Sequence, residues 1–178
     1  EGEKLASQTI NVFGLDAFEY LTFHEAETNA CPINSTINSD GSWVALGADE
    51  VNIRRRAYAL AVARLLVSHA QELQGHWQPG AEFRNAFEKP EMGAFYGSTR
   101  EVLNGLTDAL FYIEKDVKDM KVGRPIGTIN CATATCPEAI ESRYAHRSLA
   151  NIGENLAGFE LLFNGGAGMG FDDLLTQV

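Results

Sequence analysis

Apolar residues recur at intervals of three and four over long stretches of this chain, with polar residues between them. The clearest stretch runs from about Ala48 to Trp77, with Asp49 and Glu50 near its start, where a helix dipole favours negative charge. Pro79-Gly80 follows directly and is typical of a helix end. The pattern predicts one long helix, with an apolar stripe made of Val51, Tyr58, Val62, Leu65, Leu66, Ala70, Leu73 and Trp77.

The same spacing predicts further helices along the chain, and no segment shows convincing period-two alternation. Residues 28–48 are interpreted as a long irregular connection rich in Asn, Ser, Gly and Thr, and a second, polar connection follows Pro79. Long helices joined by long connections indicate an all-α fold with helical-bundle packing. The other predicted helices run from about Glu3 to His24, Met92 to Met120, Pro137 to Phe163, and from Phe171 onward.

Composition and charge narrow the functional classes. The chain has 178 residues, 45% of them hydrophobic, which is enough for one ordinary domain or two small ones. A net charge of −10 argues against nucleic-acid binding, which needs clustered Lys and Arg. The sequence contains no run of 18 apolar residues, which is about the length needed to span a membrane. The chain begins Glu-Gly-Glu and stops within an apparent helix start, so we expect a signal sequence and further residues to be missing.

The three cysteines indicate the redox state of the compartment in which the protein functions. Cys131 and Cys136 lie in a loop of small residues between predicted helices, which fits either a local disulfide or two reduced thiols. We expect the disulfide, and with it an oxidising compartment. Cys31 is left over and is either free or paired outside this chain.

Asp16 and Glu19 form the first candidate site. They stand three residues apart in an otherwise apolar helical segment, so their side chains would be neighbours on one face. Two like charges that close need a cation, a shared proton or a strong donor between them, unless both point into solvent. A carboxylate pair would favour a hard cation such as calcium, magnesium, manganese or iron.

A second candidate lies at the start of the fourth predicted helix. Glu141, Tyr144 and Ser148 recur at i, i+3 and i+7, so on a helix they would share a face. Arg143 or Arg147 could pair with buried carboxylates there. The alternative is a solvated helix start with local salt bridges.

These two segments resemble the imelysin-like family, also described as insulin-cleaving membrane proteases. Gly14-Leu-Asp16-Ala-Phe-Glu19-Tyr-Leu resembles the family signature Gly-x-His-x-x-Glu and the apolar helix that it opens. The run from Glu141 to Phe159 resembles a second segment, Glu-Ser-x-Tyr-Ser-x-x-Ser followed by Asn-Leu-x-Gly-Phe. The resemblance implies two helical bundles with the signature near their junction. Residues 1–90 would be the later helices of the first bundle, and residues 91–178 the earlier helices of the second.

The resemblance also implies a function. Family members are typically bacterial periplasmic or cell-surface lipoproteins linked to iron supply, and some are classed as metallopeptidases. The implied cofactor is a divalent metal or iron. The implied partners are the remaining portion of a longer protein or another copy, iron-uptake components, and a membrane reached through an N-terminal lipid. The implied metal or ligand site comprises Asp16, Glu19, Glu141, Tyr144 and Ser148, supported by Gly14, Ser142 and Arg143.

One departure from the signature decides between the functions. The family histidine is Asp16 in this chain, and catalytic zinc generally keeps histidine nitrogen among its ligands. The change therefore favours metal or iron binding over peptide cleavage. The alternatives are a metallopeptidase and a non-catalytic helical module whose polar residues satisfy one another.

Overall fold

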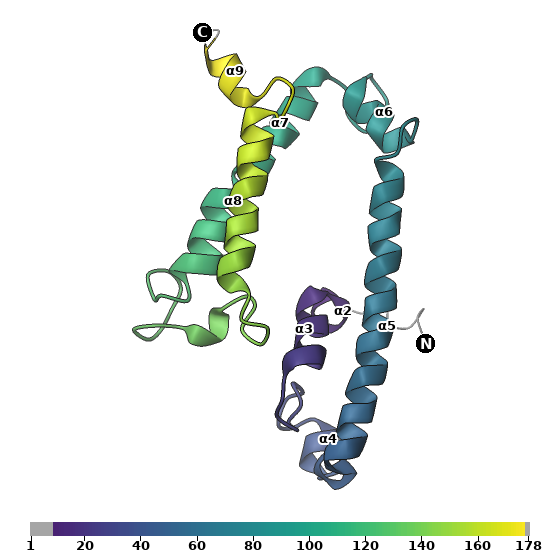
Figure 1. Cartoon of the computed structure of the whole chain (residues 1–178), viewed down its shortest axis with the longest axis vertical. Coiled ribbons are helices and arrows are strands. Elements are labelled where there is room, and N and C mark those ends of the chain that lie inside the picture. The colour runs from purple at the N-terminus through teal and green to yellow at the C-terminus, as the bar shows by residue number, and fades with distance from the viewer. Residues whose placement is uncertain (1–8, 177–178) are drawn as a thin grey trace. The chain divides into compact units, whose positions relative to one another are not determined.

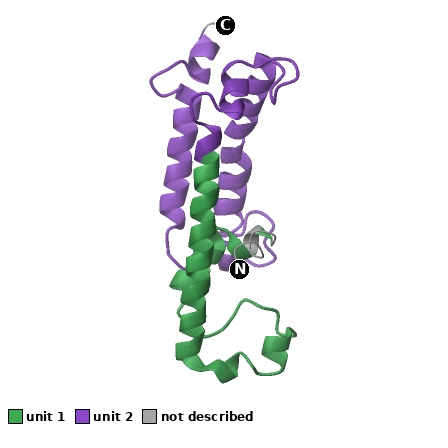
Figure 2. Cartoon of the chain, turned by 90° about the vertical axis from the view of Figure 1, so that its right-hand side faces the viewer, with its two compact units in different colours: residues 1–73 green, residues 74–178 purple. Residues whose placement is uncertain are grey.

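The computed structural model describes residues 9–176, and every regular element in that range is a helix (Figure 1). The predicted all-α fold is confirmed. The chain divides into two compact units, residues 1–73 and 74–178 (Figure 2). The boundary expected between two family bundles, at residues 90 and 91, stays a prediction.

The first unit is built on one long helix. The predicted helix over residues 48–77 is confirmed as α5 (Gly47–His76), whose first turn contains Asp49 and Glu50. Arg54 pairs with Glu50 one turn before it, at 2.7 Å. The other elements of this unit are α2 (Ile10–Phe13), α3 (Leu15–Phe23), α4 (Thr36–Ser39) and the 3-10 turn η1 (Val44–Leu46).

The helix predicted from Glu3 to His24 is interrupted. Its first residues lie outside the described range, and the described part breaks at the buried Gly14. Gly14 has an extended backbone, with φ −74° and ψ −175°, and its carbonyl accepts from the N–H of Phe18 at 3.1 Å. Glycine is a poor interior helix residue. The helix therefore restarts here, and Asp16 stands in the first turn of α3.

Two contacts join the first helices to α5. The Tyr58 hydroxyl donates to the Val12 carbonyl at 2.7 Å, and the Phe13 ring meets the His69 ring edge-on, with centroids 5.9 Å apart. Val51 and Val62 of α5 are the most deeply buried side chains described in this unit. The core of this unit is small and lies along one face of α5.

The second unit contains a helix that the sequence did not predict. Residues Glu82–Glu88, in the polar stretch after Pro79, form α6. Trp77, Phe83 and Phe87 meet there edge-on, with Trp77 5.0 and 5.2 Å from the two phenylalanine rings. Edge-to-face aromatic packing stabilises contacts beyond simple area burial. The remaining elements are α7 (Thr99–Leu110), the π-helix η2 (Ile113–Gly123), the 3-10 turn η3 (Pro137–Ala139), α8 (Ser148–Asn164) and α9 (Phe171–Thr176).

Two predicted helices have different bounds in the structure. The third begins at Thr99 rather than Met92 and changes to a π-helix at Ile113. The fourth was predicted from Pro137, but residues 141–146 are turns and α8 begins only at Ser148. The Arg147 N–H donates to the Ser142 carbonyl at 3.3 Å and His146 has a φ of +55°. A left-handed residue closes a turn and cannot continue a right-handed helix.

A capping arrangement fixes the start of α7. The Ser98 hydroxyl accepts from the Glu101 N–H at 3.3 Å, and the Glu101 carboxylate accepts from the Gly97 N–H at 2.8 Å. One N–H in the first turn of α7 and one just before the helix thereby gain side-chain acceptors.

Replacing Ser98 by Ala should lower the free energy of unfolding by about 1 kcal/mol, because the Glu101 N–H loses its side-chain acceptor. Urea unfolding followed by circular dichroism measures this. Ser68→Ala, in the exposed interior of α5, is the matched control and should be neutral or slightly stabilising. Equal losses in the two variants would contradict the capping role.

Candidate functional site

The signature carboxylates lie on one turn of α3. Asp16 is exposed in the first turn, and Glu19 is half-buried three residues later. The predicted spacing on one helix is confirmed, because both residues fall within Leu15–Phe23. The positive end of the helix dipole stabilises Asp16. Asp16 therefore stabilises the start of α3, in addition to its predicted role as a ligand.

A buried arginine of α5 fixes the other end of α3. The Arg55 guanidinium, only 6% exposed, donates to the His24 carbonyl at 3.0 Å and to the Thr28 carbonyl. It also lies over the Tyr20 ring, 5.7 Å from the centroid. Tyr20 in turn donates to the Thr28 carbonyl at 3.1 Å and stacks on His24. Arg55 thus anchors the helix that carries the carboxylate pair.

A lysine of η2 holds Glu141 in the second unit. The Lys121 ammonium lies 2.9 Å from Oε1 of Glu141 and donates to Oδ1 of Asn155 at 2.8 Å. It also lies 5.4 Å from the centroid of the Tyr112 ring. Burial lowers the pKa of Lys121, but the hydrogen bonds to Glu141 and Tyr112 outweigh burial, so the pKa is raised. Glu141 therefore faces a charged lysine at neutral pH.

Sequence reasoning missed both Arg55 and Lys121. Each side chain acts on a residue at least 20 positions away in the chain, as the Arg55–His24 and Lys121–Glu141 contacts show. A weak signal was available for Lys121, which stands four residues after the buried Val117 on the apolar stripe of the third predicted helix. A charged residue at such a position is rare unless it is paired.

The remaining predicted residues lie in the turn before α8. Ser142 is buried, and its N–H donates to the Ser148 hydroxyl at 3.2 Å. The Arg143 guanidinium donates to the Tyr144 hydroxyl and stacks on its ring, 4.6 Å from the centroid. The prediction that Glu141, Tyr144 and Ser148 share one helical face is wrong, because this segment is not helical. Ser148 instead closes the turn through its hydroxyl.

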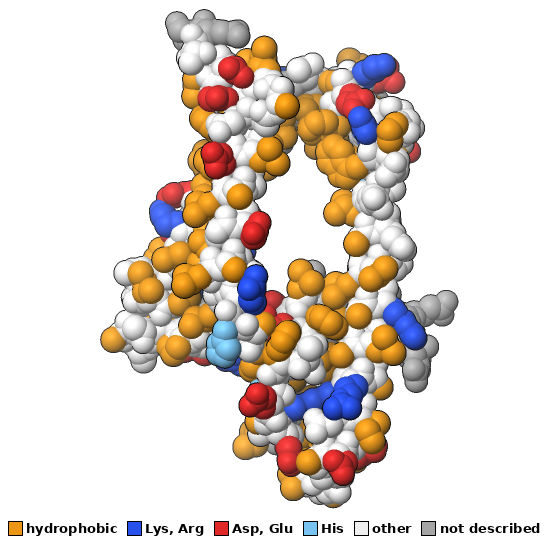
Figure 3. Space-filling model, in the orientation of Figure 1, with side chains coloured by type: hydrophobic (Ala, Val, Ile, Leu, Met, Phe, Trp, Pro, Cys, Tyr) orange, Lys and Arg blue, Asp and Glu red, His pale blue; other side chains and the backbone are white. Residues whose placement is uncertain are grey.

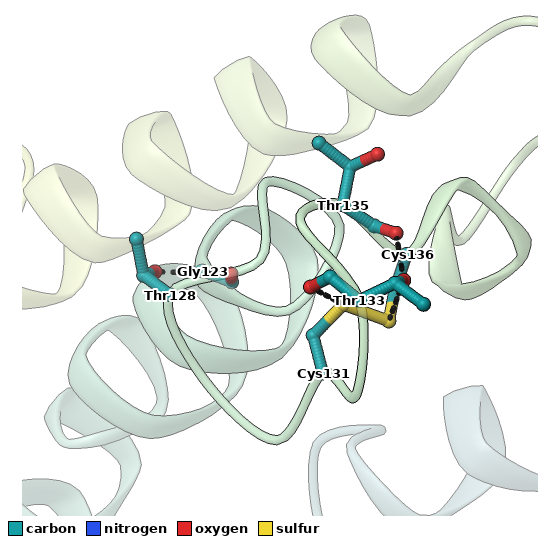
Figure 4. Close-up of a disulfide and its surroundings, with 6 residues drawn as sticks. All are labelled: Gly123, Thr128, Cys131, Thr133, Thr135 and Cys136. Carbon is teal, nitrogen blue, oxygen red and sulfur yellow. Dashed lines mark hydrogen bonds between the residues drawn. A yellow bond between two sulfur atoms is a disulfide. The ribbon is translucent and has the colours of Figure 1, made fainter.

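The predicted disulfide is confirmed between Cys131 and Cys136 (Figure 4). Cys136 is buried, and its N–H donates to the Pro125 carbonyl at 3.0 Å. The Thr133 hydroxyl donates to the Thr135 carbonyl at 2.6 Å within the loop. The disulfide loop therefore gives the chain a fixed position shortly before Glu141. Cys31 is an exposed free thiol.

The ligand set for a metal is incomplete within each unit. Among residues 9–176, no group of three or more His, Cys, Asp or Glu side chains is placed to hold a metal ion. Asp16 and Glu19 belong to the first unit, and Glu141, Tyr144 and Ser148 to the second. The meeting of these two groups at a junction stays a prediction.

Comparison with protein-family profiles matches the whole chain, residues 1–178, to the Peptidase_M75 family, described as Imelysin. The chain belongs to the imelysin family. The resemblance of the two sequence segments is thereby confirmed. Neither the curated proteins nor the solved structures contain a match to this imelysin chain. Imelysin proteins are generally extracytoplasmic, and no helix in the described part of this one is long and apolar enough to cross a membrane.

Replacing Lys121 by Met should lower the free energy of unfolding at pH 7 by about 1–2 kcal/mol, since Glu141 and Asn155 lose a charged donor. The pKa of Lys121 is raised above its ordinary value of 10.5. Its contribution is therefore present in full below pH 10.5 and is lost as the pH rises through the folded-state pKa. Urea unfolding of both proteins from pH 6 to pH 11 measures the difference.

Lys115→Met is the matched control, because Lys115 is an exposed lysine of the same helix. It should change stability little at any pH. A wild-type advantage over Lys121→Met that already declines between pH 6 and pH 9 would contradict the assigned role of the ammonium.

Proposed function

We propose that this imelysin-family chain is a binding protein of the bacterial periplasm or cell surface that captures a metal cation, iron or a divalent ion, as cargo for uptake. The observation that supports it most is the carboxylate pair on α3. Asp16 and Glu19 stand one helical turn apart, with Asp16 exposed and Glu19 half-buried. Both side chains therefore remain within reach of an ion from solvent.

The residue types favour a hard cation. Carboxylate oxygens are the preferred ligands of calcium, magnesium, manganese and ferric iron, and side chains three residues apart on a helix can reach one ion. In the family signature a histidine stands where this chain has Asp16. The exchange of imidazole nitrogen for carboxylate oxygen moves the site away from zinc and from zinc-dependent peptide cleavage.

Glu141 in the second unit is less suited to a cation. Its Oε1 lies 2.9 Å from the Lys121 ammonium, which would weaken cation binding there by charge repulsion. The proposed cation site is therefore the carboxylate pair on α3.

Asp16→Asn should weaken cation binding by roughly tenfold or more, because the site loses one of its charged ligands. The test is isothermal titration of the chelator-free protein with Mn²⁺, Ca²⁺, Zn²⁺ and Fe³⁺ supplied as its citrate complex. Asp49→Asn, an exposed aspartate in the first turn of α5, is the matched control and should leave binding unchanged. Equal effects of the two variants on cation affinity would contradict the assignment of Asp16 as a ligand.

Asp16→His restores the family signature and tests the alternatives. The variant should gain affinity for Zn²⁺ relative to Mn²⁺, because imidazole nitrogen suits zinc. Metal-dependent cleavage of a fluorogenic peptide by the wild-type chain would replace the binding proposal by a metallopeptidase. No cation binding, together with lowered stability of Asp16→Asn, would support a non-catalytic helical module.

A further inference from the structure

The first unit contains an open cavity of ≈ 690 Å³ between α3 and α5. Phe18 and Leu21 of α3, with Leu60 and Ala63 of α5, form an apolar wall. The polar residues that line it are Thr22, His24, Glu25, Asn52, Arg55 and Arg56, so two guanidinium groups and one carboxylate border the space. We call this space the α3–α5 cavity. Its volume lies in the ordinary range of small-molecule sites, and apolar walls with a few converging polar groups are typical of such sites.

Arg55 brings a buried positive charge to this cavity. Its guanidinium is 6% exposed, yet no Asp or Glu among residues 9–176 forms an ion pair with it. Its partners are the His24 and Thr28 carbonyls and the Tyr20 ring, which leave part of its five-donor capacity for another group. Burying a charge is costly unless an opposite charge and hydrogen bonds compensate it.

The end of α3 compensates this charge in part. The His24 carbonyl follows the last turn of α3, where a helix carries about half a negative charge. If Arg55 served only to hold these carbonyls, this compensation would be enough to explain its burial. That role does not explain why a second guanidinium lines the same cavity.

Arg56 is that second guanidinium. It is exposed, lines the same cavity, and forms no ion pair with any described carboxylate. Arg55 and Arg56 are consecutive residues of α5, so the two guanidinium groups reach the same cavity from one turn of the helix. Basic side chains lie beside apolar and acidic ones on the lower part of the first unit (Figure 3).

We propose that the α3–α5 cavity binds a small amphipathic carboxylate. The carboxylate lies against the guanidinium groups of Arg55 and Arg56, and the apolar body lies against Phe18, Leu21 and Leu60. Arginine suits this role because its planar fork matches carboxylate geometry. This site differs from the proposed cation site in the sign of its charge, and either can exist without the other.

Titration with octanoate and with 1-octanol, an uncharged probe of equal chain length, tests the proposal. We expect octanoate to bind at least about tenfold more tightly, because only the carboxylate gains charge-assisted hydrogen bonds. Arg56→Gln should lower octanoate affinity roughly threefold to tenfold and leave 1-octanol binding unchanged. Ala63→Leu fills the apolar part of the cavity and should weaken both probes.

Arg64→Gln is the matched control, since Arg64 is an exposed arginine of α5 outside the cavity. It removes the same charge from the same helix and should change neither affinity. Circular dichroism checks that each variant is folded. Equal affinities for octanoate and 1-octanol, the absence of octanoate binding, or equal losses in Arg56→Gln and Arg64→Gln would each overturn the proposal.

Discussion

The first unit depends on the buried guanidinium of Arg55. It joins α5 to the end of α3 through the His24 carbonyl, and to the following segment through the Thr28 carbonyl, which also accepts from the Tyr20 hydroxyl. Removing an ordinary apolar contact would only open a void. Removing this one would take a donor from the His24 and Thr28 carbonyls, lose the ring contact with Tyr20 and loosen the attachment of the helix that carries Asp16 and Glu19.

In the second unit, a lysine helps to hold an irregular segment in place. The segment between the disulfide loop and α8 has little regular backbone hydrogen bonding, so side chains must hold it. Lys121 holds Glu141, the Ser148 hydroxyl holds the backbone of Ser142, and the disulfide ends at Cys136 just before. An irregular segment fixed at several points can present polar side chains more closely together than a helix could.

The elements that sequence predicted well are those whose stabilisation is local. The helix α5 has an apolar stripe, acidic residues in its first turn and a Pro-Gly stop, all of which can be seen in the chain itself. The helix α6 was missed because it depends on aromatic contacts that reach beyond its own seven residues, including the one from Trp77.

Some residues of the candidate site could likewise be predicted from the sequence, and others could not. The carboxylate pair on α3 could be predicted from its spacing and from the family signature. The face shared by Glu141, Tyr144 and Ser148 could not be judged from spacing, because the Ser148 hydroxyl competes for the backbone and a turn replaces the helix. Arg55 and Lys121 gain their roles only through contacts between distant parts of the chain.

The disulfide has a consequence for how the protein withstands proteolysis. Residues 132–135 between the two cysteines are exposed, and exposed loops of small residues are preferred cleavage sites. A cut there would leave both pieces covalently joined through Cys131 and Cys136. The nicked chain would migrate as one species until a reductant separated it. A protease could thus cut this loop without parting the two segments that it connects.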